Sequence, residues 1–590
     1  MLKWVVIDIE TNVVGDTPSD KDEFRVMAWK DNTGKRGVTH TFHDTQRILK
    51  EYPIIIGYNI KLYDVPILVR TGFDLRNKII IDEYEVIKKH IGKLGKLNKA
   101  FNLQLSTVAK SISLKNNKQN NFDYDLLKPN DWFKNFDLIQ SYALQDIETE
   151  YELFLWLEQQ LEPFKYGLLQ YEIDRFDYMT LSTPSYAYKI ICRRTGLKEE
   201  YASTDGKHRG KYEGGYVAPP TDELLIGKIL EIDFGSAYPH AYMQANLFSN
   251  NCTCCKEHEK YSGGHLFKLK GLYCSKQQGI VEITLSELYK ERQVLKSRGD
   301  KRQLALKLLI NIMYGICGHP AFKSVYDLDR ASDCTKLGQE WVKYARKRLQ
   351  DNGYKTVYSD TDSIYVDMSD KDENELLLLR DKIINDIKSS MVFPQSTFNM
   401  PIDKRLKLMY MPGKKKKNYL YVTENDEVGV KGLKLIKDDR QRVSRTVFDK
   451  YITPIIIRDL TVKVPGSEIK RWVKEEISKD LEQACIYKKV RRDEYKHKTT
   501  IQAQIQERHG GGKHKLIPNN KYGVGIGTKL CTIKEYEEQG LTLDDIDIKQ
   551  ALTELSIFTD DNIIPNNNVN THKKTRVNKA KHNTLQEWLV

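Results

Sequence analysis

The sequence predicts a multi-domain protein in which an α/β region precedes an α+β region. Its 590 residues are several times the size of one compact domain, so more than one hydrophobic core is expected. Over roughly the first 165 residues, short β-branched runs are followed by a long stretch with helical spacing, which favours an α/β domain. Farther along, strands before and after a helical hairpin indicate the α+β region.

The first region opens with a buried strand. Residues 2–9 are β-branched and aromatic and end in acids, and residues 54–58 form a second apolar run. Residues 137–160 carry the apolar spacing of one long helix. A domain boundary is expected near Glu162-Pro163.

The second region follows a helical pattern at residues 170–205 and a Gly- and Pro-containing separator. Its expected elements, in order, are a strand at 228–234, antiparallel helices at 284–296 and 301–314, and strands at 356–367 around a tight acidic turn. Beyond about residue 425 the chain becomes polar and rich in Lys.

Composition excludes some classes of protein. The formal charge of +13 is modest beside 94 basic and 81 acidic residues, so basic patches must be located individually. No run of about 18 apolar residues could span a bilayer, and the opening residues lack the features of a secretion signal. We therefore expect a cytoplasmic protein without membrane contact. Nine cysteines in a large intracellular chain favour free thiols or metal binding over disulfides.

Three aspartates of the second region suggest a site for two divalent cations. Asp233 ends a predicted strand, while Asp360 and Asp362 lie two apart at a predicted hairpin turn. Carboxylates from separate strands are the usual way to hold paired metal ions for phosphoryl transfer. The alternative for the Asp-Thr-Asp turn is ordinary turn chemistry, because Asp favours turns through local hydrogen bonds.

The predicted helical hairpin places cations on two helices. Lys307, Asn311 and Tyr314 share one helical face, and Arg292 and Lys296 share a face of the preceding helix. Cations directed at one place suit a triphosphate. The alternative is a solvated basic surface, which would be preferred for either helix alone.

Together these residues resemble a known family. The segments Asp233-Phe-Gly-Ser236-Ala-Tyr238-Pro239, Lys307-Leu-Leu-Ile-Asn311-Ile-Met-Tyr314-Gly315 and Tyr358-Ser-Asp360-Thr-Asp362-Ser363 look like motifs A, B and C of the family B DNA polymerases, in family order. Motif A departs from the family pattern at Ala237 and His240, which we expect to adjust packing only.

The resemblance implies a right-hand polymerase of palm, fingers and thumb that uses Mg²⁺ or Mn²⁺, two ions at the site. Asp233 and Asp362 would bind both ions, with Asp360 in support. Tyr238 would lie under the sugar and exclude a 2′-hydroxyl. The dNTP would be bound by Phe234, Ser236, Ala237, Tyr238, Arg292, Lys296, Lys307, Asn311 and Tyr314.

Near the N-terminus a second set of carboxylates appears. Asp8 and Glu10 lie on the same side of a strand, where they could share a metal; the alternative is a polar strand end. Asp8-Ile-Glu10-Thr11, Asn59-Ile-Lys-Leu-Tyr63-Asp64 and Tyr142-Ala-Leu-Gln-Asp146 look like the Exo I, II and III motifs of the proofreading 3′–5′ exonuclease, an RNase H-like domain.

This resemblance implies an active exonuclease with two more Mg²⁺ ions. Asp8, Glu10, Asp64 and Asp146 would hold them. Tyr142 would orient the attacking water. The frayed primer end would be held by Thr11, Asn59 and Tyr63.

Further motifs resemble the family's contacts to primer-template DNA. Tyr212-Glu-Gly214-Gly215 looks like the segment that partitions the primer between synthesis and editing, where glycines allow close backbone approach. Lys417, Tyr419 and Lys431 match the motifs that steady the primer strand. A solvated run of lysines is the alternative for residues 414–417. Phosphate contacts would make binding sequence-independent and salt-sensitive.

Cys252, Cys255, His258 and Cys274 supply enough ligands for one tetrahedral zinc ion. The alternative is a set of small buried thiols. At the other end, Leu585, Trp588 and Leu589 follow a basic stretch at helical-turn spacing and resemble a sliding-clamp-binding peptide, although His582 replaces the usual Gln. Docking of this tail on its own thumb is an equal alternative.

The sequence thus favours a monomeric DNA polymerase with proofreading, acting in replication or repair. Short intervals between the motifs favour a nucleic-acid primer, and compactness suggests a virus or mobile element, in which case the protein would act in the host cytoplasm. A catalytically silent scaffold and a protein-primed polymerase are the rival interpretations. The expected domains are an exonuclease at 1–165, linker and first palm part at 166–278, fingers at 279–325, second palm part at 326–424, thumb at 425–575 and tail at 576–590.

Overall fold

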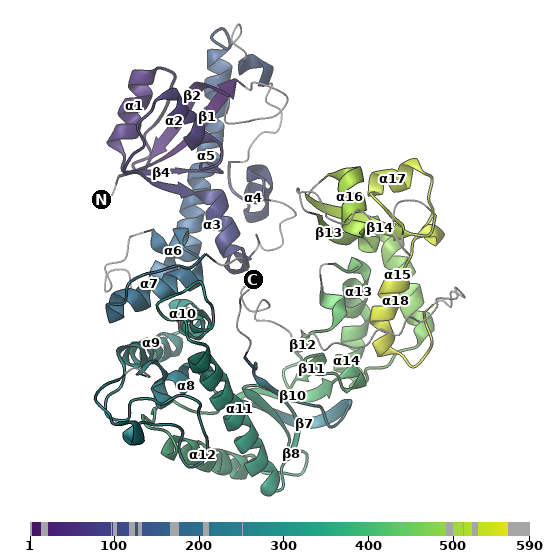
Figure 1. Cartoon of the computed structure of the whole chain (residues 1–590). Coiled ribbons are helices and arrows are strands. Elements are labelled where there is room, and N and C mark those ends of the chain that lie inside the picture. Colours follow the sequence, from purple (N-terminus) through teal and green to yellow (C-terminus); the bar gives the residue numbers. More distant parts are fainter. Residues whose placement is uncertain are drawn as a thin grey trace. The chain divides into compact units, whose positions relative to one another are not determined.

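Figure 1 shows a computed structural model of the chain. It describes residues 3–12, 22–95, 97, 103–116, 124–127, 132–165, 176–203, 212–249, 252–437, 439–490, 500–510, 512–521 and 529–564. The chain divides into two compact units. Of the described residues, those of 3–203 and 280–327 belong to unit 1, and those of 212–279 and 328–564 belong to unit 2.

Unit 1 contains a five-stranded sheet of order β3-β2-β1-β4-β5. Its strands are β1 (Trp4–Asn12), β2 (Glu23–Asp31), β3 (Arg36–Thr39), β4 (Ile54–Gly57) and β5 (Ile79–Asp82). β1 runs antiparallel to β2 and parallel to β4. The buried pattern of β1 reflects its central place, because helices cover both faces of a mixed sheet.

Strand alternation decides which residues of β1 meet which helices. Val5, Ile7 and Ile9 pack with side chains from the helices α1 (Phe42–Glu51) and α2 (Asp64–Thr71). Trp4, on the opposite face, contacts Phe154 of the long helix α5 (Phe136–Leu161), with ring centroids 4.9 Å apart. Even-numbered positions of β1 therefore face α5.

The remaining helices of unit 1 include a hairpin from later in the sequence. Its two helices, α9 and α10, both pack against α7. The remaining helices of unit 1, including these two, are α3 (Glu83–His90), α4 (Leu105–Ile112), α6 (Asp177–Thr180), α7 (Thr183–Thr195), α9 (Ile280–Ser297) and α10 (Arg302–Cys317). The hairpin turn contains Gly299 at φ +67° and Asp300, whose carboxylate accepts a hydrogen bond from the backbone N–H of Arg302 at 2.9 Å.

Unit 2 is built around a seven-stranded sheet of order β12-β11-β10-β7-β9-β8-β6, in which each neighbouring pair is antiparallel. The strands are β6 (Tyr216–Ala218), β7 (Leu224–Asp233), β8 (Lys355–Thr361), β9 (Ser363–Asp367), β10 (Ile402–Tyr410), β11 (Tyr419–Thr423) and β12 (Val428–Lys431). The helices α8 (Ala237–Ala245), α11 (Leu328–Asp351) and α12 (Glu373–Ser389) accompany it. The sheet ends at Lys431, past the palm boundary expected at residue 424.

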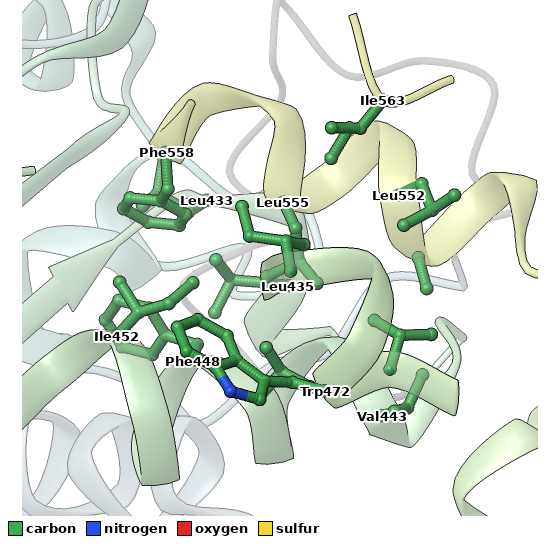
Figure 2. Packing of buried hydrophobic residues seen from close by; sticks show 14 of the residues in the cluster. Leu433, Leu435, Val443, Phe448, Ile452, Trp472, Leu552, Leu555, Phe558 and Ile563 are labelled. Carbon is green, nitrogen blue, oxygen red and sulfur yellow. The ribbon is translucent and has the colours of Figure 1, made fainter. Parts of the chain in front are cut away.

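A helical domain continues from this sheet. Leu408 and Tyr410 of β10 join its hydrophobic core, and the Tyr410 hydroxyl donates to the carbonyl of Ile557 at 2.6 Å. Figure 2 shows the core, in which Phe448 and Trp472 pack among aliphatic side chains from several helices. The helices are α13 (Arg442–Val447), α14 (Thr453–Asp459), α15 (Gly466–Lys479) and α18 (Lys549–Leu555).

A small three-stranded sheet of order β13-β14-β15 completes unit 2. It consists of β13 (Ile486–Val490), β14 (Gly512–Asn519) and β15 (Lys529–Cys531), with α16 (Ile501–His509) and α17 (Ile533–Glu538) beside it. Within the described part of the chain, none of the helices could span a membrane.

Candidate active site

The end of β7 lies beside the turn between β8 and β9. Asp233 pairs with Ser363, and the backbone N–H of Phe234 donates to the carbonyl of Asp362 at 2.9 Å. Two segments that are far apart in the sequence thereby bring Asp233 and Asp362 to one edge of the sheet.

These two carboxylates occupy a setting that disfavours negative charge. Burial, followed by the charge of Asp362, raises the pKa of Asp233 to about 8. Burial and the charge of Asp360 raise the pKa of Asp362 to about 6. A divalent cation between such groups relieves their repulsion, and an all-carboxylate donor set suits Mg²⁺.

Asp360 has a different environment, although it is only two residues away. It is 3% exposed, and its two oxygens lie 2.7 Å from Lys417 Nζ and 3.0 Å from Lys431 Nζ. Burial would raise the pKa of Asp360, but the hydrogen bond from Lys417 and the charges of both lysines hold that pKa below its ordinary value. Its charge is therefore balanced by the protein itself.

The turn geometry accounts for this difference. Thr361 has φ +66°, and the backbone N–H of Asp362 donates to the carbonyl of Asp360 at 2.8 Å. Strand alternation would place residues two apart on one face, but it does not extend through such a tight turn.

A buried network beneath Asp233 was missed by the sequence analysis. The Glu231 carboxylate accepts hydrogen bonds from the Tyr365 hydroxyl at 2.7 Å and from Lys404 Nζ at 2.5 Å. The spacing of Glu231 and Asp233, two apart on one strand, was the signal that could have revealed it.

The residues that resemble motif A are held by close packing. The side chain of Phe234 is fully buried and stacks on Phe398 with centroids 5.6 Å apart, and Ala237 is also buried. Both side chains are therefore shielded from a ligand, and the assignment of these two residues to nucleotide binding stays a prediction. Ser236 has φ +58° at the start of α8. His240 is fully buried, with Nε2 3.1 Å from the Thr397 hydroxyl.

Gly215 marks a close approach between three segments. A Cβ at this position would lie 2.6 Å from Cγ2 of Thr361 and 2.9 Å from the Tyr238 hydroxyl. Gly214, by contrast, has open space around it, and its carbonyl accepts a hydrogen bond from Gln339 at 2.5 Å. Tyr212 is half-buried just before them.

The predicted DNA-binding residues of the second region lie in the same network. Tyr419 is buried, its hydroxyl lies 3.2 Å from that of Tyr365, and Lys431 Nζ lies 5.6 Å from its ring centroid. Tyr419 therefore supports Lys431 from beneath and offers little of its own surface. The backbone N–H of Lys417 donates to the Tyr358 hydroxyl at 2.9 Å.

In unit 1, the carboxylates predicted near the N-terminus lie together. Ligand oxygens of Asp8, Glu10 and Asp146 all fall within 4.8 Å of one another. The even positions of β1 face α5, which carries Asp146, so the strand and the helix jointly form this cluster. Asp64, at the start of α2, accepts a hydrogen bond from the backbone N–H of Ile9 at 3.2 Å.

Asp64 interacts electrostatically with Asp8 of this cluster. Burial and the charge of Asp8 raise the pKa of Asp64 well above its ordinary value. Tyr142 lies one helical turn before Asp146 on α5. The Thr11 hydroxyl lies 2.6 Å from the Tyr63 hydroxyl, which donates to Asp22 at 2.6 Å. Asn59 adopts φ +59° in the β4–α2 connection.

Two buried glutamates near this cluster were not predicted. Glu150 follows Asp146 by one turn of α5 and accepts a hydrogen bond from the backbone N–H of Tyr58 at 3.3 Å. Burial and the charge of Asp8 raise the pKa of Glu150 well above its ordinary value. Burial and the charge of Asp82 do the same to the pKa of Glu83. The i, i+4 spacing to Asp146 was the available signal for Glu150.

The predicted nucleotide-binding residues of the hairpin are also in unit 1. Arg292 is buried beside Tyr289, with its guanidinium 5.8 Å from the ring centroid, and burial lowers its pKa. Lys296, Lys307 and Asn311 are exposed, and Tyr314 is half-buried. The opposite face of α10 is apolar and buried, which leaves the Lys307 face available for ligands.

The chain matches one known protein family. A family model described as DNA polymerase family B matches residues 187–517, more than half of the chain. The chain belongs to DNA polymerase family B. The matched span contains Asp233, the α9–α10 hairpin and Asp362, whereas the carboxylate cluster of β1 and α5 precedes it.

Individual relatives of the chain have low sequence identity to it. The chain is 24% identical over 541 residues to DNA polymerase 1 of Pyrococcus abyssi, an alignment that covers 81% of this chain and 68% of the relative. It is 22% identical over 619 residues to a DNA polymerase of Archaeoglobus fulgidus, covering 96% and 76%. The solved family B DNA polymerase of Pyrobaculum calidifontis shares the fold with a TM-score of 0.52 at 17% identity, covering 95% of this chain and 78% of that one.

Two remaining predictions have different outcomes. The cysteine group contains Cys252, Cys254, Cys255 and Cys274, whereas His258 is exposed and outside it. The tail with Leu585, Trp588 and Leu589 lies outside the described residues, so the clamp-binding peptide stays a prediction.

Proposed function

We propose that this family B DNA polymerase extends a nucleic-acid primer along a DNA template by two-metal phosphoryl transfer, and that its N-terminal domain is a 3′–5′ proofreading exonuclease. The observation that carries the proposal is the Asp233–Ser363 pairing, which brings Asp233 and Asp362 together. The raised pKa values of both groups support it, because buried carboxylates that repel each other are what a divalent cation stabilises.

The donor set fits Mg²⁺ or Mn²⁺. Asp233 and Asp362 would hold the ions, which when bound neutralise charge on the transferring phosphate and activate the primer hydroxyl. Asp360 acts differently: its ion pairs with Lys417 and Lys431 fix the conformation of the turn that carries Asp362. We therefore assign Asp360 a positioning role.

Residues of the hairpin and of α8 would select and hold the dNTP. Arg292, Lys296 and Lys307 supply positive charge for the triphosphate, with Asn311 and Tyr314 on the same face of α10 as Lys307. Tyr238 would support the sugar and exclude a 2′-hydroxyl. Gly215 lets the Tyr238 hydroxyl approach the turn at residues 360–362, which we call the catalytic turn.

Primer-template DNA would be bound through its phosphates. Lys417 and Lys431 are cations close to the catalytic turn, and the Tyr419 ring supports Lys431. The backbone of residues 212–215 would also contact the DNA. Such contacts carry no base readout, so we expect binding that does not depend on sequence and falls steeply with salt. We assign the seven-stranded sheet to the palm, the α9–α10 hairpin to the fingers and the helical domain to the thumb.

The exonuclease proposal rests on the cluster of Asp8, Glu10, Asp64 and Asp146. Their arrangement fits two Mg²⁺ ions, and Tyr142 is one turn from Asp146 on the same helix. Thr11, Asn59 and Tyr63 come from the adjoining strand and loop, where a frayed primer end would lie.

Primer extension and degradation by two variants test the proposal. Asp362→Ala should abolish extension of a DNA hairpin with Mg²⁺ yet still degrade single-stranded DNA from its 3′ end. Asp8→Ala should extend normally and fail to degrade, because its carboxylate belongs to a different unit. Loss of both activities in either variant would contradict separate sites.

The same assay separates the rival interpretations. A silent scaffold would bind the hairpin without extending it, and a protein-primed polymerase would extend only from a terminal protein. Extension from the bare hairpin hydroxyl by the wild-type protein is the result we expect.

A further inference from the structure

The connection between α8 and α9 is long and has little regular structure. Within its described residues it forms two short 3₁₀ helices, Leu247–Ser249 and Glu257–Glu259, and an isolated bridge between Tyr261 and Tyr273. Connections of this length inside a compact domain need some other source of order.

Part of that order comes from α11. The Asp333 carboxylate accepts hydrogen bonds from the backbone N–H groups of Lys270 and Gly271 at 2.9 and 2.8 Å, and from the Tyr273 hydroxyl at 2.8 Å. This network fixes residues 270–273, immediately before Cys274, and leaves the Cys252–Cys255 loop to be held in another way.

The four cysteines meet where that loop reaches Cys274. The sulfur atoms of Cys254 and Cys274 are 3.3 Å apart, those of Cys255 and Cys274 are 3.6 Å apart, and those of Cys254 and Cys255 are 3.8 Å apart. Cys252 completes the group, in which all four sulfurs lie within 4.8 Å of one another.

These spacings fit a metal tetrahedron. Zinc–sulfur bonds of about 2.3 Å place the sulfurs of a tetrathiolate site about 3.8 Å apart. A disulfide needs about 2 Å between two sulfurs, and it pairs thiols two by two. Here Cys274 is close to both Cys254 and Cys255, so the sulfurs form a common cluster instead of separate pairs.

The surroundings of Cys274 are typical of a metal-binding turn. Its sulfur accepts a hydrogen bond from the backbone N–H of Gln277 at 3.3 Å, and its own N–H donates to the Ser249 hydroxyl at 2.8 Å. The Asn246 amide donates to the carbonyls of Cys274 and Gln277, both at 2.9 Å. Hydrogen bonds to and around a thiolate ligand hold it in place and reduce its negative charge.

We propose that Cys252, Cys254, Cys255 and Cys274 bind one structural zinc ion. Four thiolates form a closed tetrahedral site, which is the arrangement of structural zinc. The ion would tie the Cys252–Cys255 loop to the turn at Cys274. The backbone N–H of Gly279, the last residue of unit 2 before α9, donates to Asn246 at 2.8 Å, so the ion would also order the segment that leads into the hairpin.

Metal analysis of the full chain tests this site without relying on polymerase activity. The wild-type protein, produced with zinc in the medium and purified without a histidine tag under reducing conditions, should carry about one zinc per chain. Cys252→Ser, Cys254→Ser and Cys274→Ser should each reduce zinc to the background level. His258→Ala is the matched control, because this neighbouring residue is exposed and outside the group, and it should keep the full amount.

Three results would overturn the proposal. They are a wild-type protein without zinc, zinc loss in His258→Ala with retention in Cys254→Ser, and iron in place of zinc.

A second measurement covers the case in which the serine variants fail to fold. Titration of the wild-type protein with an organomercurial should release zinc in step with modification of four thiols, because exposed Cys254 gives the reagent access. After excess dithiothreitol has removed the mercurial from the thiols and has itself been removed, refilling with Co²⁺ should give the visible absorption of a tetrahedral thiolate site. A mass that corresponds to a disulfide, or Co²⁺ bands of an octahedral oxygen site, would contradict the assignment.

Discussion

At the residue scale, Asp360 and Asp362 lie two residues apart, yet their pKa values are shifted in opposite directions. Lys417 and Lys431 balance the charge of Asp360 and lower its pKa. Burial and the charge of Asp360 raise the pKa of Asp362, whose own charge contributes to the raised pKa of Asp233. Only Asp362 is in a state that a cation would stabilise strongly.

This difference predicts unequal effects of the same substitution. Asp362→Asn should lower the rate of single-nucleotide incorporation by more than about a thousandfold, because a metal ligand is lost. Asp360→Asn should cost roughly ten- to a hundredfold, since it alters only the position of the turn. Rapid-quench measurements at saturating Mg²⁺ provide the comparison, and equal losses would contradict the assignment of Asp362 as the ligand.

Gly215 offers a second test at this scale. Gly215→Ala would push its methyl group against Thr361 and Tyr238, so the catalytic turn must shift. A displacement of this kind should reduce incorporation by about a hundredfold. Gly214→Ala is the matched control, because nothing lies within 4 Å of its Cβ position. Similar rates for both variants would mean that the turn tolerates the displacement.

At the element scale, local periodicity predicted many of the helices and strands. It did not predict which segments far apart in the sequence pair with one another. The strand at residues 2–9 is β1, and the helix at 137–160 is α5 with one more residue at each end. Alternation along β1 also placed Asp8 and Glu10 on one side. The same reasoning did not apply through Asp360-Thr-Asp362, because Thr361 adopts a left-handed conformation that interrupts the alternation.

The helical domain was placed only by its position in the sequence. Its hydrophobic core contains residues from Leu408 to Ile563, and no local sequence pattern indicates which of these residues pack together. Glu231 and Glu150 were missed for a related reason. Each lies at a regular spacing from a recognised carboxylate, but burial and partners from other elements distinguish them from surface glutamates.

The core of the helical domain makes its own prediction. Phe448 is 1% exposed and packs against Phe558, with ring centroids 5.3 Å apart. Phe448→Ala should destabilise this domain by about 3–5 kcal/mol, because it removes buried area and leaves a cavity. Urea unfolding followed by fluorescence can report it, since Trp472 lies in the same core.

The matched control is Leu378→Ala, which truncates a side chain that is 65% exposed on α12. It should change stability by no more than about 0.5 kcal/mol. If Phe448→Ala behaved like this control, the packing in Figure 2 would not describe the folded domain.

At the scale of the whole molecule, the two units alternate along the chain. The α9–α10 hairpin belongs to unit 1, yet it lies in the sequence between two parts of unit 2. Motif order could predict the family because each motif is short and local. The division into units depends on contacts between segments more than a hundred residues apart, which periodicity does not reveal.

Template-directed incorporation by the Asp8→Ala variant tests the central claim most directly, since editing would not obscure the outcome. Four DNA hairpins that differ only in the templating base are each offered one dNTP at a time with Mg²⁺. We expect efficient addition of the complementary nucleotide alone on each hairpin, and no addition after Asp362→Ala is introduced as well. Addition of the same nucleotide on all four hairpins, or no addition on any, would contradict the claim that this chain copies a DNA template.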